Sequence, residues 1–460
     1  MCPNKDMIIN PEHILNLSDD LQTDGILKTK LPKGDWTIMR FGYTSTGAYN
    51  NPASDAGRGL ECDKFNRPAL KVHYDAFVKK VIENTKAVAP NAMQYSEIDS
   101  YEMGGQNWTD GYDKLFKDKY GYNIIKFLPL YAGRFVKSPS VSDAVLWDVR
   151  QFNCDLMTEN YFGYFAELCA TDGIQSYIEP YGFGPVNDLD VGEKADINMG
   201  EFWMGREMTM VQSAVSASHI YGKNVTSSES FTSNPKINWK GHPALAKTSG
   251  DLAWVYGINE FMFHRFTHQA NPNVAPGMTM GRWGFHFDRV QPWWENAGKA
   301  WFTYMMRGQY LLRQGVPVSD FLVFIGDGSP NSVYLRKDFE PAIPSGTNFD
   351  CSNADVLINR ISIQNKTLVL PEGTRYKALV LKNSKKLSLA SLKRFYEIAK
   401  AGVPVIGELP EQVAGYLHKT EDKAEFYKIV EALKMLPNVY DGFVWEKMMR
   451  EENVSTDFSI

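Results

Sequence analysis

The sequence predicts an α/β protein, namely a (β/α)8 TIM-type barrel incomplete at its N-terminal side, followed by a small doubly wound α/β domain. Three observations support this fold class. Strand-like and helical segments alternate between residues 36 and 315, acidic and aromatic residues follow the strand-like segments, and the alternation restarts at residue 320. The chain has 460 residues, which is more than one ordinary domain needs, so two domains are expected.

The strand-like segments of the barrel portion are rich in aromatic and β-branched residues, whereas the helical segments repeat apolar residues with a helical period. The predicted strands cover residues 36–43, 94–100, 175–184 (running into a Gly/Pro loop), 224–228 and 260–264. The predicted helices cover residues 67–88, 147–171, 204–221, 243–256 and 293–314. These roughly five units are fewer than the eight of a closed barrel, so either strands escape detection or the chain begins inside the barrel.

The second domain is predicted from three apolar strands and one amphipathic helix. The strands are Phe321–Ile325, Lys377–Leu381 and Val403–Gly407, and the helix covers residues 387–401. No GxGxxG motif accompanies them, so a nucleotide site is not expected. The predicted division of the chain is 1–315 for the barrel portion with a strand and loop lead-in, 316–435 for a flavodoxin-like domain, and 436–460 for a truncated tail.

Composition and charge exclude several classes of partner. The formal net charge is −5, with no basic stripe that would indicate nucleic acid. No apolar run approaches the ~20 residues that cross a bilayer, and no signal peptide is visible. The five cysteines are scattered without CxxC spacing, so neither a zinc cluster nor a disulfide framework is expected. Aromatic residues reach 13%, which suits stacking on sugar faces or a large aromatic core.

Two glutamates at predicted strand ends are the candidate catalytic pair. Glu102 lies in the segment 94–108 and Glu229 follows the segment 224–228, both among aromatic, hydroxyl and amide side chains. Such a pair can hydrolyse a glycosidic bond, because one carboxyl protonates the leaving oxygen while the other activates water or attacks. Glu97 is the alternative acid in the first segment. The competing interpretation is that these are structural or exposed acids.

Other polar side chains are expected to bind a sugar. Glu201 and Trp203 precede a predicted helix, where the acid can hold a hydroxyl, coordinate a metal, act as a base, or simply favour the helix N-terminus. The remaining candidates are Glu61, Asp63 and Lys64 after a Gly-rich loop, Asp99, and the group His264, His268, Gln269 and Trp283. The two histidines have HxxxH spacing, but the residues before them read as a strand and the zincin glutamate is absent, so sugar contacts are favoured over zinc.

Six segments together resemble the inverting α-L-rhamnosidases of glycoside hydrolase family 106. They follow the family's order and are Arg40–Gly47, Gly59–Lys64, Asp99–Gly104, Gly200–Trp203, Ser228–Thr232 and His264–Gln269. The small α/β segment after residue 320 also resembles the domain that follows the barrel in that family.

The resemblance implies a (β/α)8 catalytic domain, removal of terminal α-L-rhamnose from plant-type glycans, and a calcium ion in the site. Glu102 matches the acid position, Glu229 the base position and Glu201 a further essential acidic residue. Glu179, at a predicted strand end, and Glu201, before a predicted helix, offer hard oxygen donors and are the candidate calcium ligands. Family members carry several hundred residues before the first matched segment. The chain is therefore expected to be an internal portion of a periplasmic or secreted enzyme acting on rhamnose-containing oligosaccharides or polysaccharides.

Two other functions stay open at this point. A partial barrel can be a catalytically inactive carbohydrate-binding fragment, and other TIM-barrel glycosidases, such as retaining galactosidases, also carry a small α/β domain after the barrel. Carboxyl separation distinguishes the mechanisms, since inverting enzymes need roughly 6.5–9.5 Å and retaining ones about 5–5.5 Å.

Overall fold

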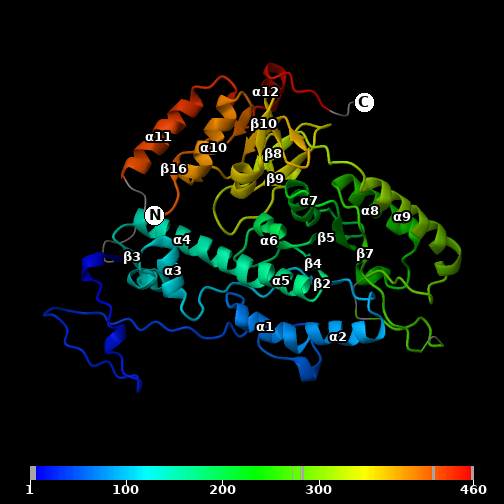
Figure 1. Ribbon diagram of the computed structural model, residues 1–460, viewed down its shortest axis with the longest axis horizontal. Coiled ribbons are helices and arrows are strands. Elements are labelled where there is room, and N and C mark those ends of the chain that lie inside the picture. Colours follow the sequence, from blue (N-terminus) through cyan, green and yellow to red (C-terminus); the bar gives the residue numbers. More distant parts are fainter. Residues whose placement is uncertain (1–6, 272, 280, 282–283, 417–419, 457–460) are drawn as a thin grey trace.

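The structure is a computed structural model that describes residues 7–271, 273–279, 281, 284–416 and 420–456. Two five-stranded sheets, each composed of parallel strands, organise these residues (Figure 1). No helix within the described ranges is long and apolar enough to cross a membrane.

The first sheet is a partial barrel with the strand order β2-β4-β5-β6-β7. Its strands are β2 (Tyr95–Ile98), β4 (Gln175–Ile178), β5 (Ile197–Trp203), β6 (Thr226–Thr232) and β7 (Met262–Phe263). All neighbouring strands are parallel and follow the chain order, with helices in the connections, as in consecutive units of a β/α barrel. The predicted fold class is therefore confirmed.

Nine α-helices of the described chain belong to this first part. They are α1 (Arg67–Ala76), α2 (Val78–Val88), α3 (Tyr112–Tyr120), α4 (Pro139–Met157), α5 (Tyr164–Thr171), α6 (Asp188–Lys194), α7 (Val211–Ile220), α8 (Pro243–Tyr256) and α9 (Lys299–Leu312). The predicted helix 147–171 starts earlier, at Pro139, where the Ser138 side chain accepts the Val141 N–H at 3.2 Å and caps the first turn. It then continues through a π-helical turn, Thr158–Gly163, into α5.

The number of barrel strands matches the expected five, but the set differs by one strand. Residues 36–43 were expected to be the first strand, yet they form no ladder with any described residue, and Ile38 is 61% exposed. Aromatic and β-branched composition alone does not make a strand where no partner strand is present. The strand β5 takes its place in the count.

The second sheet has the order β17-β15-β13-β8-β9. Its strands are β8 (Phe321–Phe324), β9 (Phe349–Ser352), β13 (Ala378–Leu381), β15 (Val405–Gly407) and β17 (Val439–Asp441). Helices α10 (Leu389–Lys400), α11 (Thr420–Lys434) and α12 (Trp445–Glu451) accompany it, and the short strands β10 (Ser362–Gln364), β11 (Thr367–Val369) and β12 (Arg375–Tyr376) form a separate antiparallel sheet. Residues 436–460 were expected to be a tail without pattern, but their described part, up to residue 456, supplies the edge strand β17 and the helix α12, whose Trp445 is buried.

Helices α6 and α7 lie between the two large sheets (Figure 1). Leu189 of α6 and Ala217 and Ile220 of α7 are buried in the same apolar core as the second sheet. His219 Nδ1 is 2.8 Å from Asp350 Oδ1 on β9. The two domains are therefore joined by a common apolar core.

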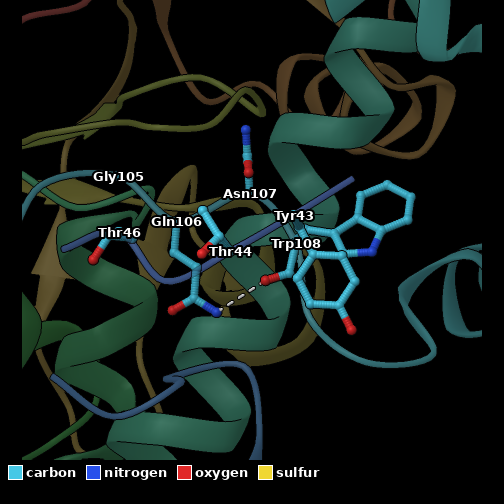
Figure 2. A pocket seen from close by; sticks show the side chains of 7 residues that line it. All are labelled: Tyr43, Thr44, Thr46, Gly105, Gln106, Asn107 and Trp108. Carbon is cyan, nitrogen blue, oxygen red and sulfur yellow. Dashed lines mark hydrogen bonds between the residues drawn. The ribbon is translucent and has the colours of Figure 1, made fainter. Parts of the chain in front are cut away.

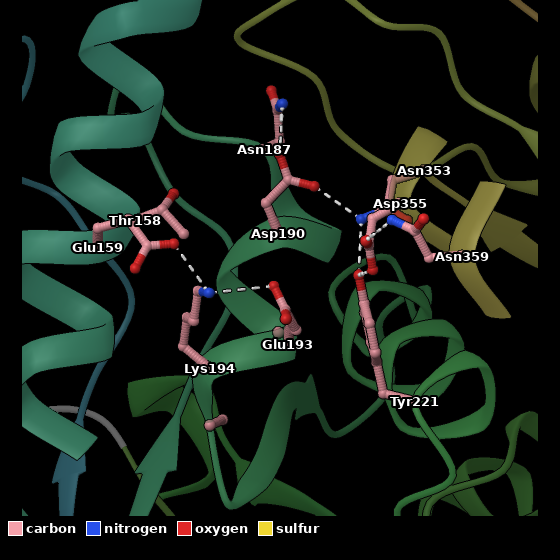
Figure 3. A network of polar contacts seen from close by, with 12 residues as sticks. Thr158, Glu159, Asn187, Asp190, Glu193, Lys194, Tyr221, Asn353, Asp355 and Asn359 are labelled. Carbon is pink, nitrogen blue, oxygen red and sulfur yellow. Dashed lines mark hydrogen bonds and ion pairs between the residues drawn. The ribbon is translucent and has the colours of Figure 1, made fainter. Parts of the chain in front are cut away.

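Polar contacts accompany this shared core (Figure 3). The Asp190 carboxylate accepts from Asn187 at 2.8 Å and from Asn353 of the second domain at 2.7 Å, and Asn353 also donates to the Tyr221 hydroxyl at 2.9 Å. Buried polar groups stabilise an interface only when they are paired in this way.

Candidate active site

The inner face of the first sheet has an apolar layer topped by acids. Tyr177, Ile197 and Met199 are buried together, with Val225 and Met262 packed against them. Side chains alternate between faces along a strand, so the residue two positions later points to the same side. The residues that continue this face are Glu179, which directly follows β4, Glu201 of β5, Glu229 of β6, which lies four positions after Val225, and His264, which directly follows β7, while Asp99 directly follows β2. The acids therefore gather at the carboxyl ends of the strands, where barrels carry their active sites.

Three of these acids converge. Asp99, Glu179 and Glu229 each offer a carboxylate oxygen, and the three oxygens lie within 4.8 Å of one another. The backbone N–H of Ser100 donates to Asp99 Oδ1 at 2.6 Å and to Glu179 Oε2 at 3.0 Å. Glu179 is 1% exposed, and its second oxygen, Oε1, forms no well-aligned hydrogen bond with any described residue.

Burial and mutual repulsion set the charge of this cluster. The pKa of Glu179 is raised well above its ordinary value, first by burial and then by Asp99, Glu229 and Glu97. Burial likewise raises the pKa of Glu229 to about 7, with further contributions from Glu201, Asp99 and Glu97, although the Thr232 hydrogen bond opposes the shift. Converging carboxylates of this kind hold either a proton or a cation.

The donor set fits calcium. Calcium prefers carboxylate and carbonyl oxygens at about 2.3–2.6 Å, so ligand oxygens around one ion lie within about 5 Å of each other. Asp99, Glu179 and Glu229 meet this spacing, and the unsatisfied Oε1 of Glu179 is the kind of buried atom that a cation would satisfy. Of the two expected ligands, Glu179 belongs to this trio, whereas Glu201 does not.

Glu229 sits beside a bulge in β6. In the ladder with β5, Glu201 pairs with Glu229 and Trp203 with Thr232, so β6 contains one extra residue. At this bulge the backbone of Phe231 adopts a left-handed conformation, with φ of 69°. The bulge lets the Thr232 hydroxyl donate to Glu229 Oε1.

His264 is the basic neighbour of Glu229. Its Nδ1 lies 3.7 Å from Glu229 Oε1, too far for a hydrogen bond. Burial, with help from Arg265, lowers the pKa of His264 to about 4, so the ring is neutral near neutral pH. A neutral imidazole can contact a sugar hydroxyl but cannot neutralise the acids around it.

Glu201 and Trp203 are linked within β5. The Trp203 indole N–H donates to Glu201 Oε1, and the Arg206 guanidinium stacks over the Trp203 ring at 4.0 Å. The pKa of Glu201 is raised mainly by burial, with additions from Asp99 and Glu102, whereas the Trp203 hydrogen bond and Arg206 lower it. Glu201 is therefore a strand residue within the acidic face, rather than the first-turn acid of a helix.

Glu102 lies in the loop above β2. An isolated bridge joins Tyr101 to Gly182 and holds this loop against the loop after β4. Only glycine fits at position 182, where φ is 138° and a Cβ would lie 2.2 Å from the Tyr101 carbonyl oxygen. The Glu102 side chain is exposed, and it lies near enough to Glu201 to raise the pKa of that residue. Glu97 lies lower, within β2.

The predicted trio Glu61, Asp63 and Lys64 is mostly engaged within the protein. Lys64 is buried and pairs with Glu61 at 2.6 Å. Both oxygens of Asp63 accept hydrogen bonds, from the Gln106 amide and the Thr109 hydroxyl. Asp63 thereby braces the loop that follows Glu102, a role that sequence spacing could not reveal because its partners are over 40 positions away.

Of the four residues predicted to form one sugar-binding group, His264, His268, Gln269 and Trp283, the three that the structure describes do not share one environment. His268 is exposed, whereas Gln269 is buried and its amide is occupied by backbone groups of Met278 on both sides, at 2.7 and 2.9 Å. Gln269 therefore fastens a loop and has little capacity left for a sugar. Trp283 lies outside the described residues.

The chain matches known proteins over nearly its whole length. A curated protein of Formosa agariphila named "Putative beta-glucuronidase" is 34% identical over 453 residues, which are 98% of this chain and 37% of that protein. A rhamnosidase from Novosphingobium sp. PP1Y has a similar structure, with a TM-score of 0.83 at 24% identity, covering 98% of this chain and 45% of that one. A β-galactosidase from Rahnella sp. R3 has a TM-score of 0.47 at 14% identity, covering 78% of this chain and 57% of that one.

A partial β/α barrel with acids near the carboxyl ends of its strands fits the class of glycoside hydrolases, whose reaction uses paired carboxyl groups. The chain belongs to glycoside hydrolase family 106, whose model, described as alpha-L-rhamnosidase, matches residues 1–458. It spans less than half the length of the Formosa and Novosphingobium proteins.

Proposed function

We propose that this chain is the catalytic portion of an α-L-rhamnosidase that removes terminal α-L-rhamnose from plant-type glycans with inversion at the anomeric carbon. The observation that carries the proposal is the convergence of Asp99, Glu179 and Glu229 at the carboxyl ends of parallel strands, with Glu102 in the loop above. Membership of a family described as alpha-L-rhamnosidase and the fold shared with a rhamnosidase support the choice of sugar.

In the proposed reaction Glu102 is the general acid and Glu229 the general base. Glu229 takes a proton from a water whose oxygen forms the new bond to the anomeric carbon. The bond from that carbon to the glycosidic oxygen breaks, and the Glu102 proton goes to this oxygen. The exposed position of Glu102 leaves room for a leaving group, whereas Glu229 lies deeper among the acids. Glu97 is the second candidate for the acid.

Asp99, Glu179 and Glu229 are the residues that would hold calcium. A calcium ion held by these oxygens would coordinate sugar hydroxyls and would so orient the ring. The protein's own contribution is to fix the three carboxylates through the Ser100 N–H and the Thr232 hydroxyl.

The test is hydrolysis of an aryl α-L-rhamnoside by the purified chain, with calcium and then with a chelator, followed by polarimetry or NMR of the first-formed anomer. Calcium-dependent release with initial formation of the β-anomer is expected. Release with retention would refute the inverting mechanism. Binding without release, shown by calorimetry with rhamnose, would favour the inactive carbohydrate-binding alternative.

A second candidate, β-glucuronidase activity, follows from the name of the Formosa relative. An aryl β-D-glucuronide in the same assay separates the two. A uronate adds a negative charge to a face that already holds Glu97, Asp99, Glu179, Glu201 and Glu229. We therefore expect the rhamnoside to be the better substrate, and preferential release from the glucuronide would overturn the proposed sugar. An aryl β-D-galactoside tests the galactosidase-like alternative.

A further inference from the structure

We propose that a pocket beside Glu102 binds the first sugar of the leaving group, and that this sugar is neutral. The inference rests on the proposed function, because it assigns the leaving-group side of the same site. The pocket has a volume of about 240 Å³ and is lined by Tyr43, Thr44, Thr46, Gly105, Gln106, Asn107 and Trp108 (Figure 2). Pockets for drug-sized ligands hold roughly 300–1,000 Å³, so this volume suits a single sugar ring.

The chain path places the pocket on the leaving-group side. Gly105 follows Glu102 by three positions, and three residues span at most about 11 Å, so the pocket begins within one or two sugar rings of the Glu102 backbone. Glu102 also lies near enough to Glu201 of the acidic face to raise the pKa of that residue. Because the general acid protonates the leaving oxygen, a pocket that begins this close to Glu102 is placed to hold the sugar on the leaving-group side.

The lining has the chemistry of a sugar subsite. Tyr43 and Trp108 lie beside each other in Figure 2, with ring centroids 6.4 Å apart and planes tilted by 38°. The hydroxyls of Thr44 and Thr46 and the amide of Asn107 complete the wall. Aromatic faces pack on the apolar face of a sugar ring, while neutral hydroxyl and amide groups bond its hydroxyls.

The wall is held in place before any ligand arrives. Trp108 stacks on the buried ring of Tyr112, with centroids 4.4 Å apart, and its carbonyl accepts the Gln106 amide at 3.3 Å. The Tyr43 hydroxyl donates to Asp110, and Asp63 holds the Gln106 amide. Groups that are already ordered lose little conformational entropy on binding.

The charges around the pocket favour a neutral ligand. No lining residue carries a charge at neutral pH, and the ionisable groups bonded to the lining side chains, Asp63 and Asp110, are both acids. The Lys64 backbone contacts Gln106, but its ammonium is buried and paired with Glu61. A uronic acid in the pocket would thus meet like charges, and none of the residues that line the pocket is a cation.

Kinetics on two substrates test the pocket through Tyr43→Ala. α-L-Rhamnosyl fluoride has a leaving group too small to reach the pocket, whereas neohesperidose, α-L-rhamnosyl-(1→2)-D-glucose, places a glucose there. Tyr43 is 57% exposed, so the variant keeps its fold, and Trp36→Ala, an exposed aromatic outside the lining, is the control. We expect kcat/KM for neohesperidose to fall about tenfold and that for the fluoride to change less than about twofold. An equal fall on both substrates, or none on neohesperidose, overturns the pocket.

A binding measurement separates failure of the pocket from failure of the proposed function. Saturation-transfer NMR with methyl β-D-glucoside and methyl β-D-glucuronide needs no rhamnose and no turnover. We expect the glucoside signal to be stronger and to fall at least about threefold in Tyr43→Ala. If the chain hydrolyses no rhamnoside but this signal behaves as expected, the pocket stands and the proposed sugar fails. An equal or stronger glucuronide signal, or a glucoside signal unaffected by Tyr43→Ala, refutes the pocket.

Discussion

At the residue scale, Glu179 is the acid whose charge has the least compensation. It is buried, lies against Asp99 and Glu229, and has one oxygen without a well-formed hydrogen bond among the described residues. Such a residue costs stability when the site is empty, yet it contributes affinity when a cation binds.

Glu179→Gln tests this balance. In the empty site the raised pKa of Glu179 means that folding has to protonate this carboxyl, whereas glutamine is neutral already. We therefore expect a Tm about 2 °C or more above wild type in chelator, corresponding to roughly 1 kcal/mol. Added calcium should then raise the Tm of the variant less than that of wild type. The matched control is Glu201→Gln, which lies on the same face but outside the trio. Thermal denaturation gives both values, and an unchanged calcium response would argue against the assigned ligands.

The variant Glu102→Gln tests whether Glu102 is the general acid. A glutamine cannot donate the proton, so we expect kcat/KM on an unactivated rhamnoside to fall about 10²–10⁴-fold, with little loss on a dinitrophenyl rhamnoside. Glu207→Gln, an exposed acid paired with Lys337, is the control. Equal loss on both substrates would transfer the acid role to another residue, and the same assay on Glu97→Gln would then follow.

The sequence singled out several acids that the structure brings to one face, but not which of them converge. Glu179 and Glu229 were candidates because each lies at the end of a strand-like segment, whereas Glu201 was a candidate because it stands beside Trp203 before a predicted helix. That Asp99, rather than Glu201, completes the trio depends on how side chains from three strands come together in space. Local residue patterns do not encode that arrangement.

At the element scale, β5 shows why one strand escaped prediction. Its sequence contains Gly200 and Glu201, both poor strand formers. A Cβ at position 200 would lie 2.9 Å from the Val211 Cα, so the glycine permits close approach of α7. The requirement comes from a helix that crosses the strand, and it is not visible within the strand itself.

The Lys223 side chain caps the C-terminal end of α6. Its ammonium donates to the carbonyls of Gly192, Glu193 and Ala195, which a helix end would otherwise leave unsatisfied. We expect Lys223→Met to lower the free energy of unfolding by about 1–3 kcal/mol, measured by urea denaturation. The control is Lys240→Met, at an exposed position, and an equal loss in both variants would contradict the capping role.

At the scale of the whole molecule, Asp188 makes stability depend on pH. It is 4% exposed, and burial raises its pKa from 3.8 to about 7. The folded state thus holds this proton more tightly than the unfolded chain. Its contribution to stability is full below about pH 4 and is lost as the pH rises through about 7.

Asp188→Asn should remove this dependence. The amide oxygen can still accept the Val333 N–H, which lies 3.1 Å from the carboxylate, but the side chain cannot ionise. We expect the variant to be more stable than wild type at pH 8 by at least about 1 kcal/mol and to differ less at pH 5. Urea midpoints at both pH values provide the check, with exposed Asp143→Asn as the control. A larger advantage at pH 5 than at pH 8 would show the reverse linkage.

Helix α7 has consequences beyond stability. Nine of its ten residues are buried, because one side covers the first sheet and the other covers the second sheet. Such a helix has no solvent face on which substitutions could accumulate freely, and neither sheet can be exchanged for a foreign one without redesigning it. The two domains are therefore expected to be inherited together, as a single evolutionary unit, and a search for recombined relatives should find the exchange points outside them.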